Sequence, residues 1–284
     1  MIFWIASYPK SGNTWLRTLI SSYYYTKDGI YNDNIIKKIG QFPEKRHFTE
    51  FEYDQKIVTD TSKFWLKAQQ SINKDKQLRF FKTHNVFGSL NNQQFTNKEN
   101  SIGCIYIVRD PRNVITSLKN HYEMNDDQTL KWMSNEKQFI YDVQNLEKDG
   151  YSDFQFISSW ETNYKSWKVQ NKIPIKIIKY EDLLNQTYAV FMDVVKFINE
   201  TTNNKEKISK DKLKNSVNST LFDKLKNNEE KYGFSEAIQS KKENKKIPFF
   251  HLGPKNDWRK ILDEDFKKKL NNVFEKNLTE LLYN

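Results

Sequence analysis

The sequence predicts an α/β fold, a three-layer sandwich around a central, mostly parallel β-sheet. Four short runs rich in apolar, β-branched and aromatic residues have strand character, at 2–7, 78–82, 102–108 and 175–178. None alternates between apolar and polar residues, which is typical of parallel strands buried on both faces. Helical stretches follow or separate these runs, at 14–25, 112–121, 154–170 and 182–199. The order β-α-β-β-α-α-β-α indicates a sheet covered by helices on both faces.

The length of 284 residues fits a single domain spanning 1–284. The single cysteine, Cys104, excludes an intrachain disulfide and favours a reducing compartment. The first predicted strand begins too early to leave room for a signal peptide, and no apolar run is long enough to span a membrane. We therefore expect a cytoplasmic location and no membrane partner.

The net charge of +10 raises the alternative of a nucleic-acid-binding protein. Much of the excess lies in Lys-rich and Asn-rich stretches that are typical of solvated helix faces and loops, at 203–214, 241–246 and 267–269. No nucleic-acid-binding motif accompanies them. We expect no nucleic-acid partner, because a site for a small polyanionic cofactor explains a basic chain equally well.

The loop after the first predicted strand has the composition of an anion cradle. Residues 8–15 read YPKSGNTW and end in the first turn of the first predicted helix. A helix N-terminus, a glycine, a lysine and two hydroxyls suit a phosphate loop of the P-loop kind. The order of residues differs from the GxxxxGK[ST] of a Walker A motif. It closely resembles the 5′-phosphosulfate loop (YPKSGTTW) of sulfotransferases that use 3′-phosphoadenosine-5′-phosphosulfate (PAPS), with Asn13 in place of the first Thr.

The resemblance implies a P-loop NTPase-like fold and a role for each residue of the loop. Lys10 is expected to neutralise the phosphosulfate and the charge that develops as the S–O bond breaks. The 5′-phosphate is expected to be held by Ser11, Gly12, Asn13 and Thr14. Trp15 alone would fit a simple core position, but in the resembling family it stacks on the adenine.

A second block joins the strand predicted at 102–108 to the helix that follows it. Arg109, Asp110 and Pro111 stand at the start of this helix, and Ser117 lies about two turns further on. Arg109 and Asp110 alone could form a local ion pair. The block resembles the family's 3′-phosphate motif, in which an Arg at the strand end and a Ser eight residues later both contact the 3′-phosphate. Arg109 and Ser117 have this spacing.

A third element, at 80–84, reads FFKTH and carries the candidate catalytic groups. His84 lies just past a predicted buried strand, where open α/β sheets place their ligands. It resembles the His of the family's Lys-Thr-His motif, the general base for the acceptor proton, and Lys82 matches the Lys that assists at the sulfonate. The family's Leu-Pro after this His is replaced by Asn85-Val86. The other histidines, His47, His121 and His251, are expected to be structural.

Two segments further along the chain resemble the family's adenine contacts. Tyr180 begins a Tyr-Glu-Asp segment after the fourth predicted strand, and in the family this Tyr reaches the adenine. Thr220 and Phe222 match a Thr-Ser-Phe segment, whose Phe closes on the adenine opposite the loop Trp.

The last segment to match, 253–258, resembles the family's Arg-Lys-Gly-x-x-Gly-Asp-Trp signature from Gly253 onward. His251 and Leu252 stand where Arg-Lys is usual, which removes a cation for the 3′-phosphate. Lys255 is the candidate that compensates. The polar stretch before this segment, 226–250, is expected to be a long loop that acts as a lid.

Together these matches imply an enzyme, a sulfotransferase that moves a sulfonate group from PAPS to an acceptor hydroxyl or amine and releases 3′,5′-diphosphoadenosine (PAP). His84 would take the acceptor proton, and Lys10 with Lys82 would stabilise the leaving charge. We expect no metal, since the sequence has no His/Cys ligand cluster with the spacing of a metal site.

Several alternatives stay open. A P-loop kinase or NTPase would need GK[ST] order and an acidic Mg²⁺ ligand, for which Asp110 is a poor candidate. A non-catalytic nucleotide-binding or nucleic-acid-binding module is a further alternative. The acceptor is a small molecule or a glycan, and the protein a monomer or a homodimer. Nearby aromatic residues would suit a phenol or stack on a sugar, or they belong to the core: Phe42, Phe48, Phe51, Phe81 and Phe87.

Overall fold

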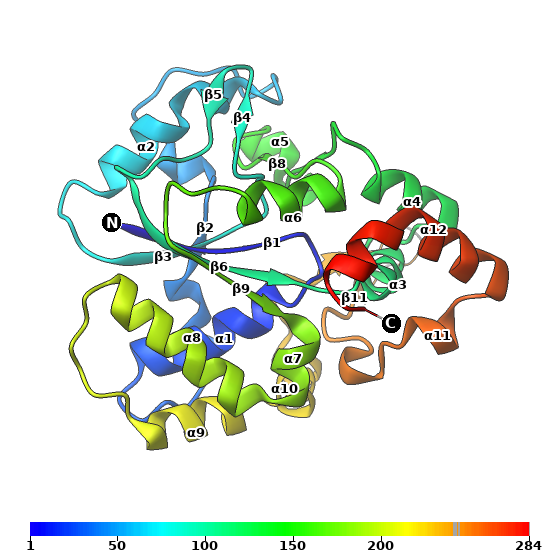
Figure 1. The fold of residues 1–284 in the computed structure, drawn as a ribbon. Coiled ribbons are helices and arrows are strands. Elements are labelled where there is room, and N and C mark those ends of the chain that lie inside the picture. The colour runs from blue at the N-terminus through cyan, green and yellow to red at the C-terminus, as the bar shows by residue number, and fades with distance from the viewer. Residues whose placement is uncertain (241–242, 244, 284) are drawn as a thin grey trace.

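The computed structural model describes residues 1–240, 243 and 245–283. A parallel five-stranded sheet forms its centre, in the order β2-β3-β1-β6-β9. Helices cover both faces of this sheet, so the predicted three-layer α/β fold is confirmed (Figure 1). The strands of the sheet are β1 (Ile2–Ser7), β2 (Gly40–Gln41), β3 (Arg79–Thr83), β6 (Ser101–Val108) and β9 (Ile175–Lys179).

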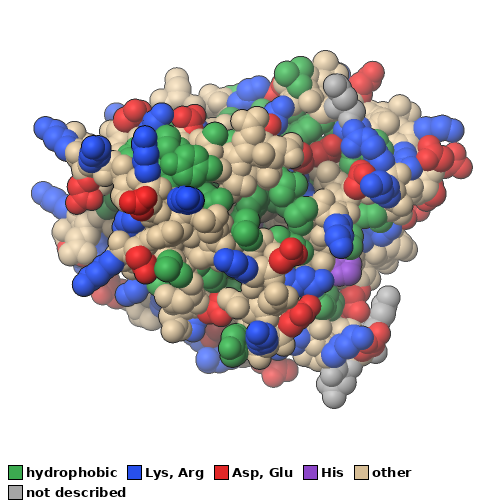
Figure 2. All heavy atoms as spheres, turned by 90° about the horizontal axis from the view of Figure 1, so that it is seen from below, with side chains coloured by type: hydrophobic (Ala, Val, Ile, Leu, Met, Phe, Trp, Pro, Cys, Tyr) green, Lys and Arg blue, Asp and Glu red, His purple; other side chains and the backbone are tan. Residues whose placement is uncertain are grey.

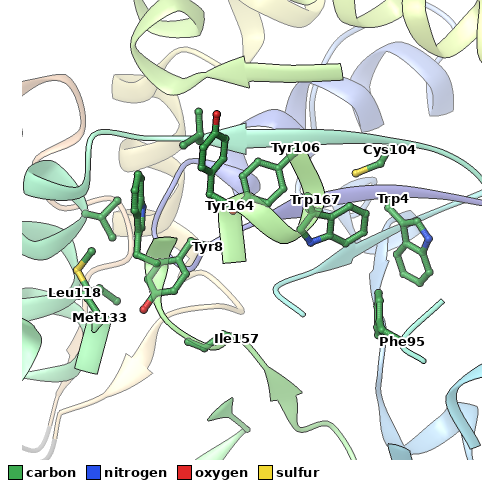
Figure 3. Close-up of a cluster of buried hydrophobic side chains, with 14 of the residues drawn as sticks. Trp4, Tyr8, Phe95, Cys104, Tyr106, Leu118, Met133, Ile157, Tyr164 and Trp167 are labelled. Carbon is green, nitrogen blue, oxygen red and sulfur yellow. The ribbon is translucent and has the colours of Figure 1, made fainter. Parts of the chain in front are cut away.

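The two faces of the sheet belong to two separate hydrophobic clusters. In β1, Trp4 and Ala6 pack into one cluster, while Phe3 and Ile5 pack into the other. Side chains of a strand point alternately to opposite faces, so a strand buried on both sides needs an unbroken apolar run. Figure 3 shows the aromatic side of the sheet, where Trp4 lies near Cys104 of β6 and near Trp167 of the helix α6 (Trp160–Lys168).

One layer of helices covers each face (Figure 1). The first layer contains α1 (Asn13–Tyr25), α8 (Thr187–Thr201) and α9 (Lys210–Ser219), and the second contains α2 (Trp65–Ile72) and α6 (Trp160–Lys168). The remaining helices are α3 (Pro111–Tyr122), α4 (Asp126–Met133), α5 (Leu146–Asp149), α7 (Tyr180–Asn185), α10 (Phe222–Tyr232), α11 (Trp258–Ile261) and α12 (Glu264–Glu280). In the part of the chain that the structure describes, three small antiparallel two-stranded sheets pair β4 (Ser89–Leu90) with β5 (Gln93–Gln94), β7 (Phe139–Ile140) with β8 (Gln155–Phe156), and β10 (Ile238–Gln239) with β11 (Lys246–Ile247).

Two predicted helices have different boundaries in the structure. The helix expected at 154–170 begins only at Trp160, because Ser159 caps it by accepting a hydrogen bond from the backbone N–H of Thr162 and the preceding residues form β8. The helix expected at 182–199 is interrupted at Gln186, whose φ of −135° and ψ of 49° lie outside the helical region. Neither change moves a strand of the central sheet.

The segment 226–250 is not one long loop. Its first seven residues continue α10, and part of the rest forms the β10–β11 hairpin. Residues 241, 242 and 244, which belong to the predicted lid and to the predicted solvated stretch at 241–246, lie outside the described residues.

The strands of the sheet all end at the same edge, because they are parallel. Ser7 pairs with Ile107 near the ends of β1 and β6, and Ala6 pairs with Thr83 near the ends of β1 and β3. The residues that follow these strands therefore come together at the carboxyl edge, where ligands bind in open α/β sheets.

Asn163, on α6, connects the end of β3 to the helix layer that contains α2 and α6. Its Nδ2 donates to the backbone oxygens of His84 (2.9 Å) and Ile157 (2.8 Å), and its Oδ1 accepts from the Tyr106 hydroxyl at 2.8 Å. Asn163 is fully buried, so these hydrogen bonds have no competition from water.

Replacing Asn163 with Ala should lower the free energy of unfolding by at least about 2 kcal/mol, since each buried group left unsatisfied costs about 1–3 kcal/mol. Urea denaturation measures the effect. The exposed Asn227 on α10 is the matched control, and Asn227→Ala should stay within about 0.5 kcal/mol of the parent. An equally small effect of Asn163→Ala would contradict this account.

Candidate active site

A cavity of about 1280 Å³ opens at the carboxyl edge of the sheet. It is lined by residues that follow β1, β3, β6 and β9, together with residues from the C-terminal third of the chain. Twelve of the predicted site residues line it: Lys10, Gly12, Asn13, Thr14, Trp15, Lys82, His84, Arg109, Ser117, Tyr180, Phe222 and Gly253. The structure thus brings together motifs that are up to 243 residues apart in the sequence, from Lys10 to Gly253.

The loop between β1 and α1 requires glycine at one position. Gly12 has a φ of 98°, and a Cβ there would lie 2.5 Å from a ring carbon of Tyr180. Gly12 supplies no side-chain cap to α1, and the first turn of this helix contains no acidic residue. The first backbone N–H groups of the helix are therefore suited to an anion, which the positive end of the helix also favours.

Asn13 holds the end of β1 against the start of α1. Its Nδ2 donates to the backbone oxygen of Ile5 at 2.9 Å and to Oγ of Ser7 at 3.2 Å. The side-chain donors of Asn13 thus face the strand, and its contribution to anion binding falls to its backbone N–H.

Several cations meet a carboxylate beside this loop. Glu236 accepts hydrogen bonds from Thr14 Oγ1 at 2.6 Å, from Arg17 at 2.5 Å and from Lys82 Nζ at 3.1 Å. Lys10 Nζ lies 3.9 Å from the centre of the Phe249 ring. The site can therefore hold at least one buried negative charge.

Burial above all, together with the charges of Arg109 and Lys82, lowers the pKa of Lys10 to about 7, although the charge of Glu236 opposes this change. A bound polyanion would favour the charged ammonium and raise this pKa again. Binding of an anion would therefore favour the protonated form of Lys10.

His84 is oriented as a base. Its Nδ1 donates a hydrogen bond to the backbone oxygen of Ser7 at 2.7 Å, which leaves Nε2 as the atom with the free lone pair. Its backbone N–H donates to Oε1 of Gln155 at 2.7 Å. Burial, and next the charge of Lys82, lowers the pKa of His84 to about 3, so the imidazole is neutral at physiological pH.

Arg109 lies on the opposite side of the loop from Lys82. It is 6% exposed, its guanidinium stacks 4.2 Å from the centre of the Tyr180 ring, and NH1 donates to the backbone oxygen of Lys10 at 3.0 Å. Ser117, on the second turn of α3, lines the cavity together with its neighbour Thr116. Arg109 and Ser117 thus line one cavity, and their joint contact with a 3′-phosphate stays a prediction.

Aromatic residues surround the end of the cavity next to Arg109. The rings of Trp15 and Tyr180 meet edge to face, with centroids 5.8 Å apart. Trp15 Nε1 donates to the backbone oxygen of Thr220 at 3.0 Å. A Cβ at Gly253, where φ is 53°, would lie 2.2 Å from the Phe222 ring. This end of the cavity offers flat apolar surfaces that suit a purine ring.

The structure places three predicted site residues away from the cavity surface. Ser11 is fully buried beneath the loop, and Thr220 is fully buried and contributes its backbone oxygen to Trp15. Lys255 is exposed and does not line the cavity as the described residues define it. Its predicted role as a substitute for the missing Arg-Lys gains no support, because its neighbours Pro254 and Asn256 line the cavity and Lys255 does not.

Other lining residues were not predicted from the sequence. Arg17 lies one turn after Asn13 on α1, so helical spacing from the loop could have revealed it. Glu236 and Phe249 reach the site through tertiary folding, and no local pattern marks them. His121 and His251, expected to be structural, also line the cavity.

The end of the cavity near His84 and Gln155 is rich in polar residues. Two segments meet there, since Lys45 Nζ donates to the Lys148 backbone oxygen at 2.7 Å and to Asp149 at 3.1 Å. Burial raises the pKa of Asp153 to about 6. Its Oδ2 accepts from the backbone N–H of Asp142, and its Oδ1 has no hydrogen-bond partner within the described part of the chain.

The aromatic residues considered for the acceptor are core residues instead. Phe42, Phe48 and Phe81 are buried in the cluster on the aromatic side of the sheet, and Phe51 and Phe87 pack against it. None of the five lines the cavity. The suggestion of an aromatic acceptor platform is therefore wrong for these residues, because their rings complete the core.

Residues 1–240, 243 and 245–283 include no group of three or more His, Cys, Asp and Glu side chains that could hold a metal ion. The same described ranges contain no helix that is both long and apolar enough to cross a membrane.

Comparison with known proteins gives a family match along nearly the whole chain. The sequence model of the family described as Sulfotransferase domain matches residues 2–281. The luciferin sulfotransferase of Photinus pyralis is 24% identical over 288 residues, covering 97% of this chain and 71% of that protein. Sulfotransferase 1A1 of Rattus norvegicus is 21% identical over 280 residues, covering 97% of this chain and 84% of that protein.

Solved structures share the fold at lower identity. Mouse sulfotransferase SULT7A1 complexed with PAP superposes with a TM-score of 0.58 at 18% identity, covering 98% of this chain and 84% of that one. Retinol dehydratase in a complex with retinol and PAP gives a TM-score of 0.58 at 17% identity, covering 98% and 81%. Both likenesses establish the architecture.

The environment of His84 predicts that its imidazole stays neutral when the pH is lowered from 8 to 5, because its pKa lies near 3 while an unperturbed His titrates near 6.5. NMR of histidine-labelled protein measures this, with the His84→Asn variant identifying the signal. The same residue in urea-unfolded protein is the control and should titrate at about 6.5. A midpoint between 6 and 7 in the folded protein would refute the buried, neutral base.

Proposed function

The chain belongs to the sulfotransferase domain family, and we propose that it transfers a sulfonate group from PAPS to a hydroxyl of a hydrophilic acceptor in the cavity described above. The observation that carries this proposal is the convergence of a 5′-phosphate cradle, a second cation at Arg109 and a neutral base at His84 on one cavity.

The cavity suits the co-substrate at both of its charged ends. PAPS would supply the sulfonate and a leaving group that carries negative charge. The N-terminus of α1, Thr14 and Lys10 would hold the 5′-phosphosulfate. The carboxylate of Glu236, which accepts a hydrogen bond from Thr14, supports an anion site at this end of the cavity. Arg109 and Ser117 would hold the 3′-phosphate.

The reaction needs one proton acceptor and a way to stabilise leaving charge. His84 Nε2 would take the proton of the acceptor hydroxyl, since Nδ1 is committed to Ser7. The acceptor oxygen would form a bond to sulfur while the bond between sulfur and the bridging oxygen breaks. Lys10 and Lys82 would stabilise the charge that returns to the phosphate, acting in a largely buried setting where such charges interact strongly.

A hydrophilic acceptor is favoured by the lining near His84. Glu44, Thr49, Ser152, Asp153 and Gln155 line this end. A polyhydroxylated molecule such as a sugar could form hydrogen bonds with those polar groups that reach the cavity surface. A phenol or other apolar alcohol would form fewer hydrogen bonds with this polar lining.

The alternative of a P-loop kinase or NTPase is not favoured. Asp110, its candidate Mg²⁺ ligand, caps α3 by accepting from the backbone N–H of Arg112 and forms an ion pair with the Arg112 guanidinium at 2.8 Å. Acidic and basic side chains are interspersed on the face shown in Figure 2, which likewise offers no continuous basic track for a nucleic acid.

Replacing His84 with Asn should slow sulfonate transfer by about 10²–10⁴-fold and leave PAP affinity nearly unchanged, because the base is lost while the phosphate contacts remain. The measurement uses labelled PAPS with a panel of sugars, polyols and phenols, and calorimetry with PAP. Sugars and polyols should be sulfated faster than phenols by the parent protein.

Two outcomes would contradict the proposal. Transfer at the parental rate by the His84→Asn protein would move the base to another residue. A parent protein that binds no PAP and transfers no sulfonate to any member of the panel would refute the proposed activity itself.

A further inference from the structure

Glu236 places a carboxylate among the groups that the proposed function assigns to the phosphosulfate. Oε2 accepts from Thr14 Oγ1 at 2.6 Å, and Oε1 accepts from Arg17 and from Lys82 Nζ, at 2.5 and 3.1 Å. Thr14 and Lys82 belong to the predicted phosphate and sulfonate contacts. The carboxylate therefore lies where these groups need their anion.

Glu236 is held as an anion at this position. Burial alone raises the pKa of its carboxyl group, but the charges of Lys82 and Arg17 and the hydrogen bond from Thr14 together hold that pKa well below its usual value. The Arg17 side chain is 6% exposed and that of Glu236 is 21% exposed, so the pair is shielded from water and screened little by salt.

The segment that carries Glu236 is folded against the cavity. We call residues 234–238 and 247–250 the strap. Ile238 pairs with Ile247, and the Phe234 ring packs 5.1 Å from the rings of both Phe249 and Phe250. Phe249 also covers the ammonium of Lys10 at 3.9 Å.

One hydrogen-bond acceptor fixes the end of the strap. Glu229, on α10, accepts the backbone N–H groups of Phe249 (2.7 Å) and Phe250 (2.8 Å). The strap is therefore held by its own packing and hydrogen bonds, independently of the contacts that Glu236 makes in the cavity.

We propose that Glu236 is a built-in competitor for the phosphosulfate site, which occupies that site when the co-substrate is absent, and that Arg17 becomes a ligand of the phosphosulfate when Glu236 withdraws. This inference rests on the proposed function, because it assumes that the cradle at Lys10 and Thr14 binds a phosphosulfate. It adds Arg17 to the binding residues and gives the strap a role in setting affinity.

The competition arises because the Glu236 carboxylate and the phosphosulfate cannot occupy the same site together. Thr14 has one hydroxyl proton to donate, and Glu236 accepts it. A second anion beside the carboxylate would also be repelled by it. Co-substrate binds the fraction of molecules whose carboxylate has withdrawn, and the apparent dissociation constant is raised by the reciprocal of that fraction.

Replacing Glu236 with Gln removes the competing charge and keeps the size of the side chain. Arg17 and Lys82 then lose the charge of their hydrogen-bonded carboxylate and favour an external anion. We expect the dissociation constant of PAP to fall by about tenfold or more, measured by calorimetry at one fixed salt concentration. Glu230→Gln is the matched control, since Glu230 is exposed on α10 and should leave the constant unchanged.

A second arm tests Arg17. In the Glu236→Gln background, Arg17→Gln should weaken PAP binding by about fivefold or more, because a charge-assisted contact between the Arg17 guanidinium and the ligand is lost. In the parent background the same substitution should have a smaller effect, since it also releases Glu236. Equal effects in both backgrounds would show that the two residues are not coupled through the site.

The outcomes separate this inference from the proposed function. If the parent binds PAP and a folded Glu236→Gln protein binds it equally well or more weakly, Glu236 does not compete with the co-substrate. Its role would then be to position the side chains of Arg17 and Lys82. If that variant does not fold, Glu236→Asp, whose shorter side chain reaches the cations less well, must tighten binding or the inference fails. Absence of PAP binding in the parent and in every variant would refute the proposed function and, with it, this inference.

Discussion

Positive charge concentrated at the carboxyl edge of the parallel sheet is the constraint on which the rest of the site depends. Lys10, Lys82 and Arg109 follow or end three neighbouring strands, and Arg17 projects from the helix between two of them. Burial disfavours each of these charges unless a partner balances it. The chain supplies partners of its own, in the carboxylate of Glu236 and in the rings of Phe249 and Tyr180. A nucleotide with two phosphate groups and a sulfonate is the kind of ligand that would balance the same charges better.

The sequence was sufficient, for a local reason, to predict four of the five strands of the sheet, all but β2 (Gly40–Gln41), and twelve of the residues that line the cavity. The apolar runs at 2–7 and 102–108 are long enough to be strands buried on both faces, and the residues after parallel strands must lie at one edge. Lys10, His84, Arg109 and Tyr180 each stand within three residues of a strand end, so their convergence follows from the strand positions alone.

The parts that sequence reasoning missed depend on contacts between distant segments. Glu236 meets Thr14 across 222 residues, and nothing in its neighbourhood marks it as a site residue. The break at Gln186 and the late start of α6 at Trp160 reflect backbone geometry and a cap that the apolar pattern does not contain. Phe42 and Phe48 were considered for the acceptor because they are aromatic, yet the core uses them. Aromatic composition alone cannot distinguish these two uses.

The proposed function requires one cavity to recognise both phosphates of the nucleotide, the 5′ group at the loop after β1 and the 3′ group at Arg109. The most direct test compares the affinities of PAP and AMP for the parent protein with their affinities for Arg109→Ala. A charge-assisted contact is worth about 1.5–3 kcal/mol, so PAP should bind the parent at least about tenfold more tightly than AMP, and most of this difference should vanish in the variant. Equal affinities of the parent for PAP and AMP would contradict the claim.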